Sequence, residues 1–95
     1  MILEVAILDI KEEKLAEFEP TFKEASKIIA SMKGYISHKL QKSVEQNNRY
    51  ILLVKWKTLE DHTIGFRGSN EYQEWKGLLH HFYNPFPVVE HYEVV

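Results

Sequence analysis

The strongest predicted β-strand in this sequence, and the stretch that decides its fold, is Arg49-Tyr50-Ile51-Leu52-Leu53-Val54-Lys55-Trp56-Lys57. Successive side chains of a strand point to opposite faces of a sheet. One face of this strand therefore carries Tyr50, Leu52, Val54 and Trp56, and the other carries Ile51 and Leu53. Because both faces are apolar, we expect both to be covered.

The segments before this strand predict a hairpin, a further strand and a helix. Residues 35–44 are rich in β-formers, and the polar turn Glu45-Gln46-Asn47-Asn48 connects them to residues 49–57. Residues 2–10 predict a strand that is also apolar on both faces. An amphipathic helix follows, with the buried stripe Leu15, Phe18, Phe22, Ala25, Ile29 and Met32. We expect Pro20 to kink this helix or to start its second half, and Gly34 to lie just past its end.

The segments after the strand predict two helical pieces and a last strand. Thr58 is suited to cap the first piece, which should end near Gly65 or Gly68. Ser69 can cap a second piece, whose buried stripe is Tyr72, Trp75, Leu79 and Phe82. Asn84-Pro85-Phe86-Pro87 cannot continue a helix, and residues 88–95 predict the final strand.

The order strand, helix, strand, strand, helix, strand predicts one ferredoxin-like α+β domain over residues 1–95. Its four-stranded antiparallel sheet would carry both helices on one face. The first and third strands are apolar on their second face as well. A second copy of the chain is the natural cover for that face, so we expect a homodimer.

Composition excludes several classes of function. Lys plus Arg total 12 against 14 Asp plus Glu, with no basic stripe, so no nucleic-acid partner is expected. No apolar run is long enough to span a membrane, and the N-terminus lacks the features of a signal peptide. The chain has no cysteine, which excludes disulfides and cysteine-based metal sites and makes a cytoplasmic location the default. Its glycines form no dinucleotide or phosphate-binding motif.

Three segments carry a resemblance to a known family. Trp56-Lys57-Thr58-Leu59-Glu60-Asp61-His62 resembles the end of the third strand in antibiotic biosynthesis monooxygenase domains. Residues 62–69, with Tyr72 and Trp75, resemble the second-helix region of that family, and residues 80–92 resemble the close of one bacterial subgroup. The resemblance implies a dimeric α+β barrel, in which two sheets pack face to face and each subunit holds a pocket between its sheet and helices.

The resemblance also implies a chemistry that uses no cofactor. A small phenol or quinol loses a proton, its anion reduces dioxygen, and the resulting peroxide collapses to a quinone. Such a site needs a base, oxyanion donors and a dry aromatic pocket. His62 is the candidate base, with Arg67 and Tyr72 as the donors. The candidate substrate-binding walls are Trp56, Phe66 and Trp75.

Each candidate also has a structural interpretation, which stays open at this point. Trp56, Tyr72 and Trp75 fit core packing, His62 fits a helix histidine bonded to a carbonyl, and Arg67 fits an ion pair. Adjacent helix residues point about 100° apart, so His80 and His81 are poorly placed to share a metal ion. No metal site is therefore expected.

Several positions depart from the family pattern. Leu52 and His62 stand where the antibiotic-modifying members carry asparagine and tyrosine. The haem-degrading members need an asparagine on the first strand, where this chain has aliphatic residues and Asp9, and a histidine where it has Lys76. Haem degradation is therefore disfavoured. Two alternatives to oxygenation remain, a non-catalytic aromatic-ligand-binding or stress-response dimer and a dimer whose pocket is filled by its own side chains.

Overall fold

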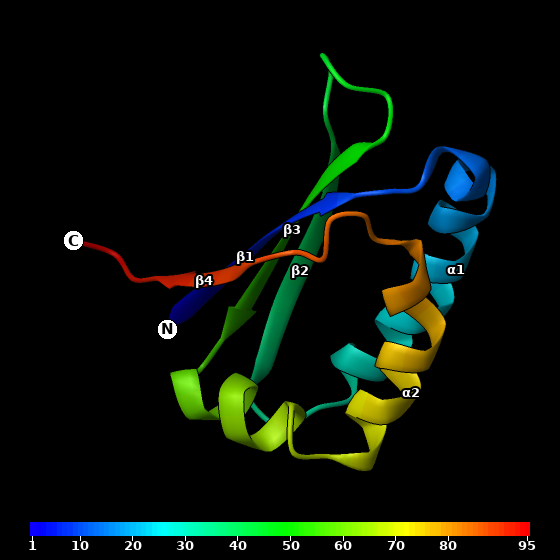
Figure 1. The fold of residues 1–95 in the computed structure, drawn as a ribbon. Helices are drawn as coiled ribbons and strands as arrows, with labels where there is room; N and C mark the ends of the chain where they lie inside the picture. The colour runs from blue at the N-terminus through cyan, green and yellow to red at the C-terminus, as the bar shows by residue number, and fades with distance from the viewer.

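The computed structural model describes residues 1–95 and has the predicted order of elements (Figure 1). The strands are β1 (Ile2–Asp9), β2 (Tyr35–Lys42), β3 (Arg49–Trp56) and β4 (Val89–Tyr92). The two main helices are α1 (Leu15–Ala30) and α2 (Asn70–Leu79). Three short helical segments complete the chain: η1 (Glu12–Lys14), the π-helical η2 (Asp61–Phe66) and η3 (His80–Phe82).

The four strands form one antiparallel sheet in the order β2-β3-β1-β4. β1 and β3 lie at its centre and pair along their whole length, from Ile2 opposite Trp56 to Asp9 opposite Arg49. Both α1 and α2 lie on one side of this sheet (Figure 1). The predicted ferredoxin-like α+β subunit is therefore confirmed.

The core lies between the sheet and the two helices, where strand alternation directs every second side chain. From β3, Leu52, Val54 and Trp56 are at most 3% exposed. From α1, Phe18 and Phe22 belong to the same core cluster, and the centroids of these two rings are 5.9 Å apart. Part of this core also lines the candidate site.

Three local predictions about chain ends and caps are confirmed. The hydroxyl of Thr58 accepts a hydrogen bond from the backbone N–H of Asp61, and that of Ser69 accepts one from the N–H of Tyr72. Gly34 follows α1 with φ of +83°, a backbone conformation that favours glycine. The caps at Thr58 and Ser69 set the starts of the helical segment after β3 and of α2.

Two local predictions need correction. Pro20 does not start a second helical piece, because α1 runs unbroken through it, and the alternative of a kink at Pro20 stays a prediction. Its ring faces solvent while Phe18 and Phe22 anchor the helix on the core side. The last strand ends at Tyr92 instead of Val95. Tyr92 pairs with Leu3, so only Ile2 of β1 remains beyond this pair.

The sheet face opposite the helices is not covered within the chain. We call this surface the open face, and define it as Leu3, Val5, Ile7, Ile51, Leu53 and Tyr92. Ile7 is 47% exposed and Tyr92 is 50% exposed. The predicted excess of apolar residues on the second face of β1 and β3 is thus present. None of the helices has the length and apolar character needed to cross a membrane.

Candidate functional site

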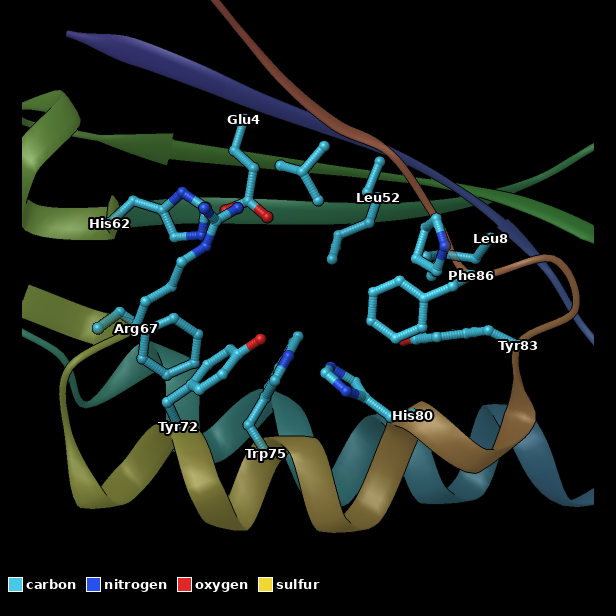
Figure 2. Close-up of a pocket in the computed structure, with 14 residues that line it drawn as sticks. Glu4, Leu8, Leu52, His62, Arg67, Tyr72, Trp75, His80, Tyr83 and Phe86 are labelled. Carbon is cyan, nitrogen blue, oxygen red and sulfur yellow. The ribbon is translucent and has the colours of Figure 1, made fainter. Parts of the chain in front are cut away.

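A cavity of about 390 Å³ lies between the sheet and the segment from η2 to α2 (Figure 2). A volume of this size is within the range of small-molecule sites. Nine of its 14 lining residues are hydrophobic. The lining residues are Glu4, Ala6, Leu8, Leu52, His62, Phe66, Arg67, Tyr72, Trp75, His80, Tyr83, Phe86, Pro87 and Val89.

One wall of the cavity holds a buried polar cluster contributed by four elements. Glu4 on β1 accepts a hydrogen bond at Oε1 from the indole N–H of Trp56 on β3, at 2.9 Å. Nε2 of His62, on η2, lies 3.3 Å from the same oxygen. Nδ1 of His62 is hydrogen-bonded to Nε2 of His91 on β4, at 2.7 Å. Glu4 and His62 are 5% and 3% exposed, so this cluster is shielded from solvent.

Burial dominates the electrostatics of the cluster. It raises the pKa of Glu4, although the Trp56 hydrogen bond and the charge of Arg67 act in the opposite direction. Burial, together with the charges of Arg67 and His91, lowers the pKa of His62 to about 3. His62 is therefore a neutral imidazole at neutral pH. A proton taken up by the pair resides on the carboxyl group of Glu4.

The contacts of His62 do not favour its predicted role as the base. Each of its ring nitrogens has a polar neighbour inside the protein, and the ring lies flat against Trp56. An imidazole with a pKa of about 3 is also a weak proton acceptor at neutral pH. His62 is in the wall of the cavity, and its contacts are those of a residue that holds Glu4 in place.

The predicted position of Trp56 needs correction. Trp56 is fully buried and does not line the cavity. The ring stacked against it is that of His62, with centroids 5.3 Å apart and an angle of 20° between the planes. Trp56 therefore lies one layer behind the cavity wall and acts on the site through its hydrogen bond to Glu4.

The other predicted site residues are brought together in the cavity. Phe66 and Trp75 form part of its wall, with ring centroids 5.7 Å apart. Tyr72 lines the same space because Ser69 caps α2 and sets its first turn. Arg67 projects from the end of η2 toward Glu4 (Figure 2) and makes no ion pair with a carboxylate. The ion pair that we considered for Arg67 is therefore absent.

The reasoning from sequence missed Glu4 and His80. Glu4 lies on the same face of β1 as Ala6 and Leu8, so the signal was a charged residue at a core-facing position of the strand. His80 follows α2 and lines the cavity, whereas His81 lies outside it and contacts Lys14 and the carbonyl of Leu78. The signal for His80 was its place one turn after Lys76 on the stripe of Tyr72.

Four cavity side chains are hydrogen-bond donors with no partner inside the protein: Arg67, Tyr72, Trp75 and His80. Figure 2 shows the Tyr72 hydroxyl, the Trp75 indole nitrogen and the His80 ring directed into the cavity. All four residues line the cavity, and Arg67 is also exposed to solvent. No set of three or more His, Asp or Glu side chains is arranged to hold a metal ion. The cavity therefore presents hydrogen-bond donors between largely hydrophobic walls.

The fold and the cavity define a ferredoxin-like domain with a candidate site between its sheet and helices. The model of the antibiotic biosynthesis monooxygenase family matches residues 1–78, and the chain belongs to this family.

The chain is similar to three further proteins. An uncharacterized protein of Bacillus subtilis, YczJ, is 60% identical over 95 residues, which cover 100% of both chains. A crystal structure from Bordetella bronchiseptica, named for the same family, has a TM-score of 0.93 at 31% identity and covers 99% of this chain and 96% of its own. SnoaB of Streptomyces nogalater, a cofactor-independent oxygenase, has a TM-score of 0.78 at 17% identity and covers 99% and 92%.

Proposed function

We propose that this protein is a cofactor-independent monooxygenase that acts on a small phenolic or quinol substrate with dioxygen. The observation that carries the proposal is a ligand-sized aromatic cavity with a buried carboxyl group on one wall and unpartnered donors on another. A phenol needs a proton acceptor for its hydroxyl and an apolar seat for its ring. Both are present in one cavity.

The proposed reaction needs no external reductant. The phenol loses its proton, and the phenolate transfers one electron to dioxygen. The ring radical and superoxide then join through a carbon–oxygen bond to form a peroxide. Cleavage of the O–O bond leaves one oxygen on the ring as a carbonyl, and the other oxygen leaves as water. The four electrons that reduce dioxygen come from the substrate, which is released as a quinone.

Arg67 and Tyr72 are the groups that would stabilise the phenolate. Both line the cavity, and neither side chain has a partner within the chain. A donor that is already in place stabilises developing negative charge without having to reorganise during the reaction. Phe66 and Trp75 would enclose the ring of the substrate.

The comparisons support the proposal at the level of family and fold. The family is named for monooxygenation, and SnoaB, which has the same fold, is described as a cofactor-independent oxygenase. Neither comparison specifies a substrate for this chain. The substrate class in the proposal rests on the polar and aromatic groups of the cavity.

The proposal includes a homodimer in which two open faces pack against each other. Leu3, Val5, Ile7, Ile51 and Leu53 would then be removed from water on both subunits. Packed sheets lie about 10 Å apart, so their side chains fill the space between them. The helices and the cavity of each subunit would remain on the outside.

Oxygen uptake with a panel of phenols and hydroquinones tests the proposal. Wild-type protein freed of metals should consume dioxygen with at least one member. Arg67→Ala and Tyr72→Phe should each lower kcat about 10²–10³-fold with that compound. Tyr35→Phe is the matched control for the second variant, because the Tyr35 hydroxyl bonds His38 and does not line the cavity. If aromatic compounds bind but none is turned over, the chain is a ligand-binding module instead.

A further inference from the structure

Glu4 is the only carboxylate that lines the cavity. It lies on β1 on the same face as Ala6 and Leu8, where the other side chains are apolar. Placing a carboxyl group at such a position costs stability unless it is hydrogen-bonded. A core-facing acid beside an organic-ligand cavity is therefore a candidate for chemistry.

The two oxygens of Glu4 have different surroundings. Oε1 accepts the N–H of Trp56 and has Nε2 of His62 at 3.3 Å. Oε2 has no hydrogen bond within the protein. No fully buried side-chain nitrogen or oxygen lacks a hydrogen-bond partner, so Oε2 must be accessible. Because Glu4 lines the cavity, Oε2 opens onto it. One oxygen thus fixes the side chain, and the other is free to meet a ligand.

The charged and titratable groups around Glu4 come from three elements. His62 lies in η2 and Arg67 directly follows it, while His91 lies in β4 and Tyr83 in the segment after η3. Arg67 is the only permanent charge among them, and it favours both a carboxylate and a phenolate. Burial has the opposite effect and raises the pKa of Glu4, which makes this carboxylate a stronger base than one in water.

We propose that Glu4 is the general base of the site, with His62 and Trp56 as the residues that position it. This inference rests on the proposed function. The phenolic O–H bond of the substrate breaks, its electron pair stays on the substrate oxygen, and the proton binds Oε2 of Glu4. The neutral Glu4 then returns this proton to the peroxide formed with dioxygen. When the O–O bond breaks, Glu4 takes the proton from the ring carbon and gives it to the departing hydroxide, which leaves as water.

The strongest rival for this role is His80. It also lines the cavity, and its ring makes only aromatic contacts, with Tyr72, Tyr83 and Phe86. Burial and the charge of Lys76 lower the pKa of His80, which weakens it as a proton acceptor. Its neighbours also include no anion to stabilise an imidazolium. His80 is better suited to donate or accept a hydrogen bond at the far end of the substrate.

Two pairs of variants separate Glu4 from His80. Glu4→Gln keeps an oxygen for the Trp56 N–H but cannot bind the proton. Its control is Glu90→Gln, the same change on β4 at a residue that accepts a hydrogen bond from Tyr92 and lies outside the cavity. His80→Gln removes the rival base, and His81→Gln makes that change at the next residue, outside the cavity. Glu4→Asp, with a shorter carboxylate, serves if Glu4→Gln does not fold. Glu4→Asp should lower kcat less than Glu4→Gln does, because it keeps a carboxylate.

Two readouts keep this inference distinct from the proposed function. The first is kcat for oxygen uptake, which should fall about 10²–10⁴-fold in Glu4→Gln and stay unchanged in Glu90→Gln and His81→Gln. The second uses 4-nitrophenol, whose absorption spectrum distinguishes phenol from phenolate. At a pH below the pKa of the free probe, wild type should bind part of it as phenolate with the proton on Glu4, and Glu4→Gln should bind it as the neutral phenol, because an amide cannot accept the proton.

Each of three outcomes supports or overturns the inference. If Glu4→Gln retains turnover and probe ionisation while His80→Gln loses them, the base is His80 and the inference is wrong. If no compound is turned over but the probe ionises in wild type and not in Glu4→Gln, Glu4 is the proton acceptor and oxygenation is wrong. If there is no turnover and the probe fails to bind, or ionises equally in both proteins, both proposals fail.

Discussion

His62 lies flat against Trp56, with ring centroids 5.3 Å apart and 20° between the ring planes. This contact joins η2 to the end of β3. It also explains why both residues meet Glu4, since Trp56 donates to its Oε1 and His62 lies 3.3 Å from the same atom. The three side chains form one packed unit behind the cavity.

His62→Ala should destabilise the fold. The substitution leaves a hole beside Trp56 and removes a neighbour of the buried Glu4, so we expect a loss of about 2–4 kcal/mol in the free energy of unfolding. Urea denaturation measures it. The exposed His81→Ala should stay within about 0.5 kcal/mol of wild type. Equal stability of the two variants would show that the stacked contact does not hold η2 in place.

Stability should fall as the pH drops below neutrality. The pKa of His62 is about 3 in the folded chain against an ordinary value of 6.5, so the unfolded chain binds the proton more tightly. The contribution of the neutral His62 to the free energy of unfolding is fully present above pH 6.5. It is lost as the pH falls toward 3, with a slope of at most about 1.4 kcal/mol per pH unit. Burial lowers the pKa of His38, His80 and His91 in the same sense.

Glu4 acts in the opposite sense. Because its pKa is raised in the folded chain, its contribution to the stability of the fold is present at low pH and is lost as the pH rises. Urea titrations at several pH values, on wild type and His62→Gln, isolate the contribution of His62. The variant should show a flatter dependence between about pH 6.5 and about pH 4.5, inside the window set by the depressed pKa. Parallel curves for the two proteins would contradict the depressed pKa of His62.

The open face should hold two subunits together. Sedimentation equilibrium at low micromolar concentration should give about twice the 11.3 kDa mass of the chain. Ile7→Glu would place a charge in the buried interface and should shift the protein to monomers. Ile64→Glu is the matched control, because Ile64 is 69% exposed on η2 and outside the open face. A wild-type mass of about 11.3 kDa would remove the dimeric barrel.

Two glycine variants should change stability in opposite directions. Gly34 has φ of +83°, and a Cβ there would clash with the carboxylate of Asp61. Gly34→Ala should therefore cost about 1–3 kcal/mol. Gly77 is inside α2, and no atom lies within 4 Å of the place that a Cβ would occupy, so Gly77→Ala should add about 0.5–1 kcal/mol. Thermal unfolding of both variants checks the pair, and a stabilised Gly34→Ala would be inconsistent with the turn.

Much of the fold could be predicted because its signals are local. The caps at Thr58 and Ser69 depend on residues three positions away, and the alternation of Leu52, Val54 and Trp56 depends on strand geometry alone. Pro20 was harder to interpret, because its effect on α1 depends on whether the packing of the helix tolerates a lost hydrogen bond.

The site could be predicted only in part. The resemblance led to Phe66, Arg67, Tyr72 and Trp75, which do line one cavity. Glu4 was missed because the apolar residues around it make residues 2–10 resemble a continuous apolar strand. Its partners Trp56 and His62 also lie far away in the sequence.

The sequence by itself determined the order of the elements, the apolar faces of the strands and the turns between them. These follow from side-chain periodicity and capping, which act over a few residues. Only the tertiary structure decided that Glu4, His62 and His91 meet. Glu4 lies opposite His91 because β1 pairs with β4, and η2 returns His62 to that edge. Their contact depends on the long-range register of the sheet, and their protonation depends on the burial that this register creates.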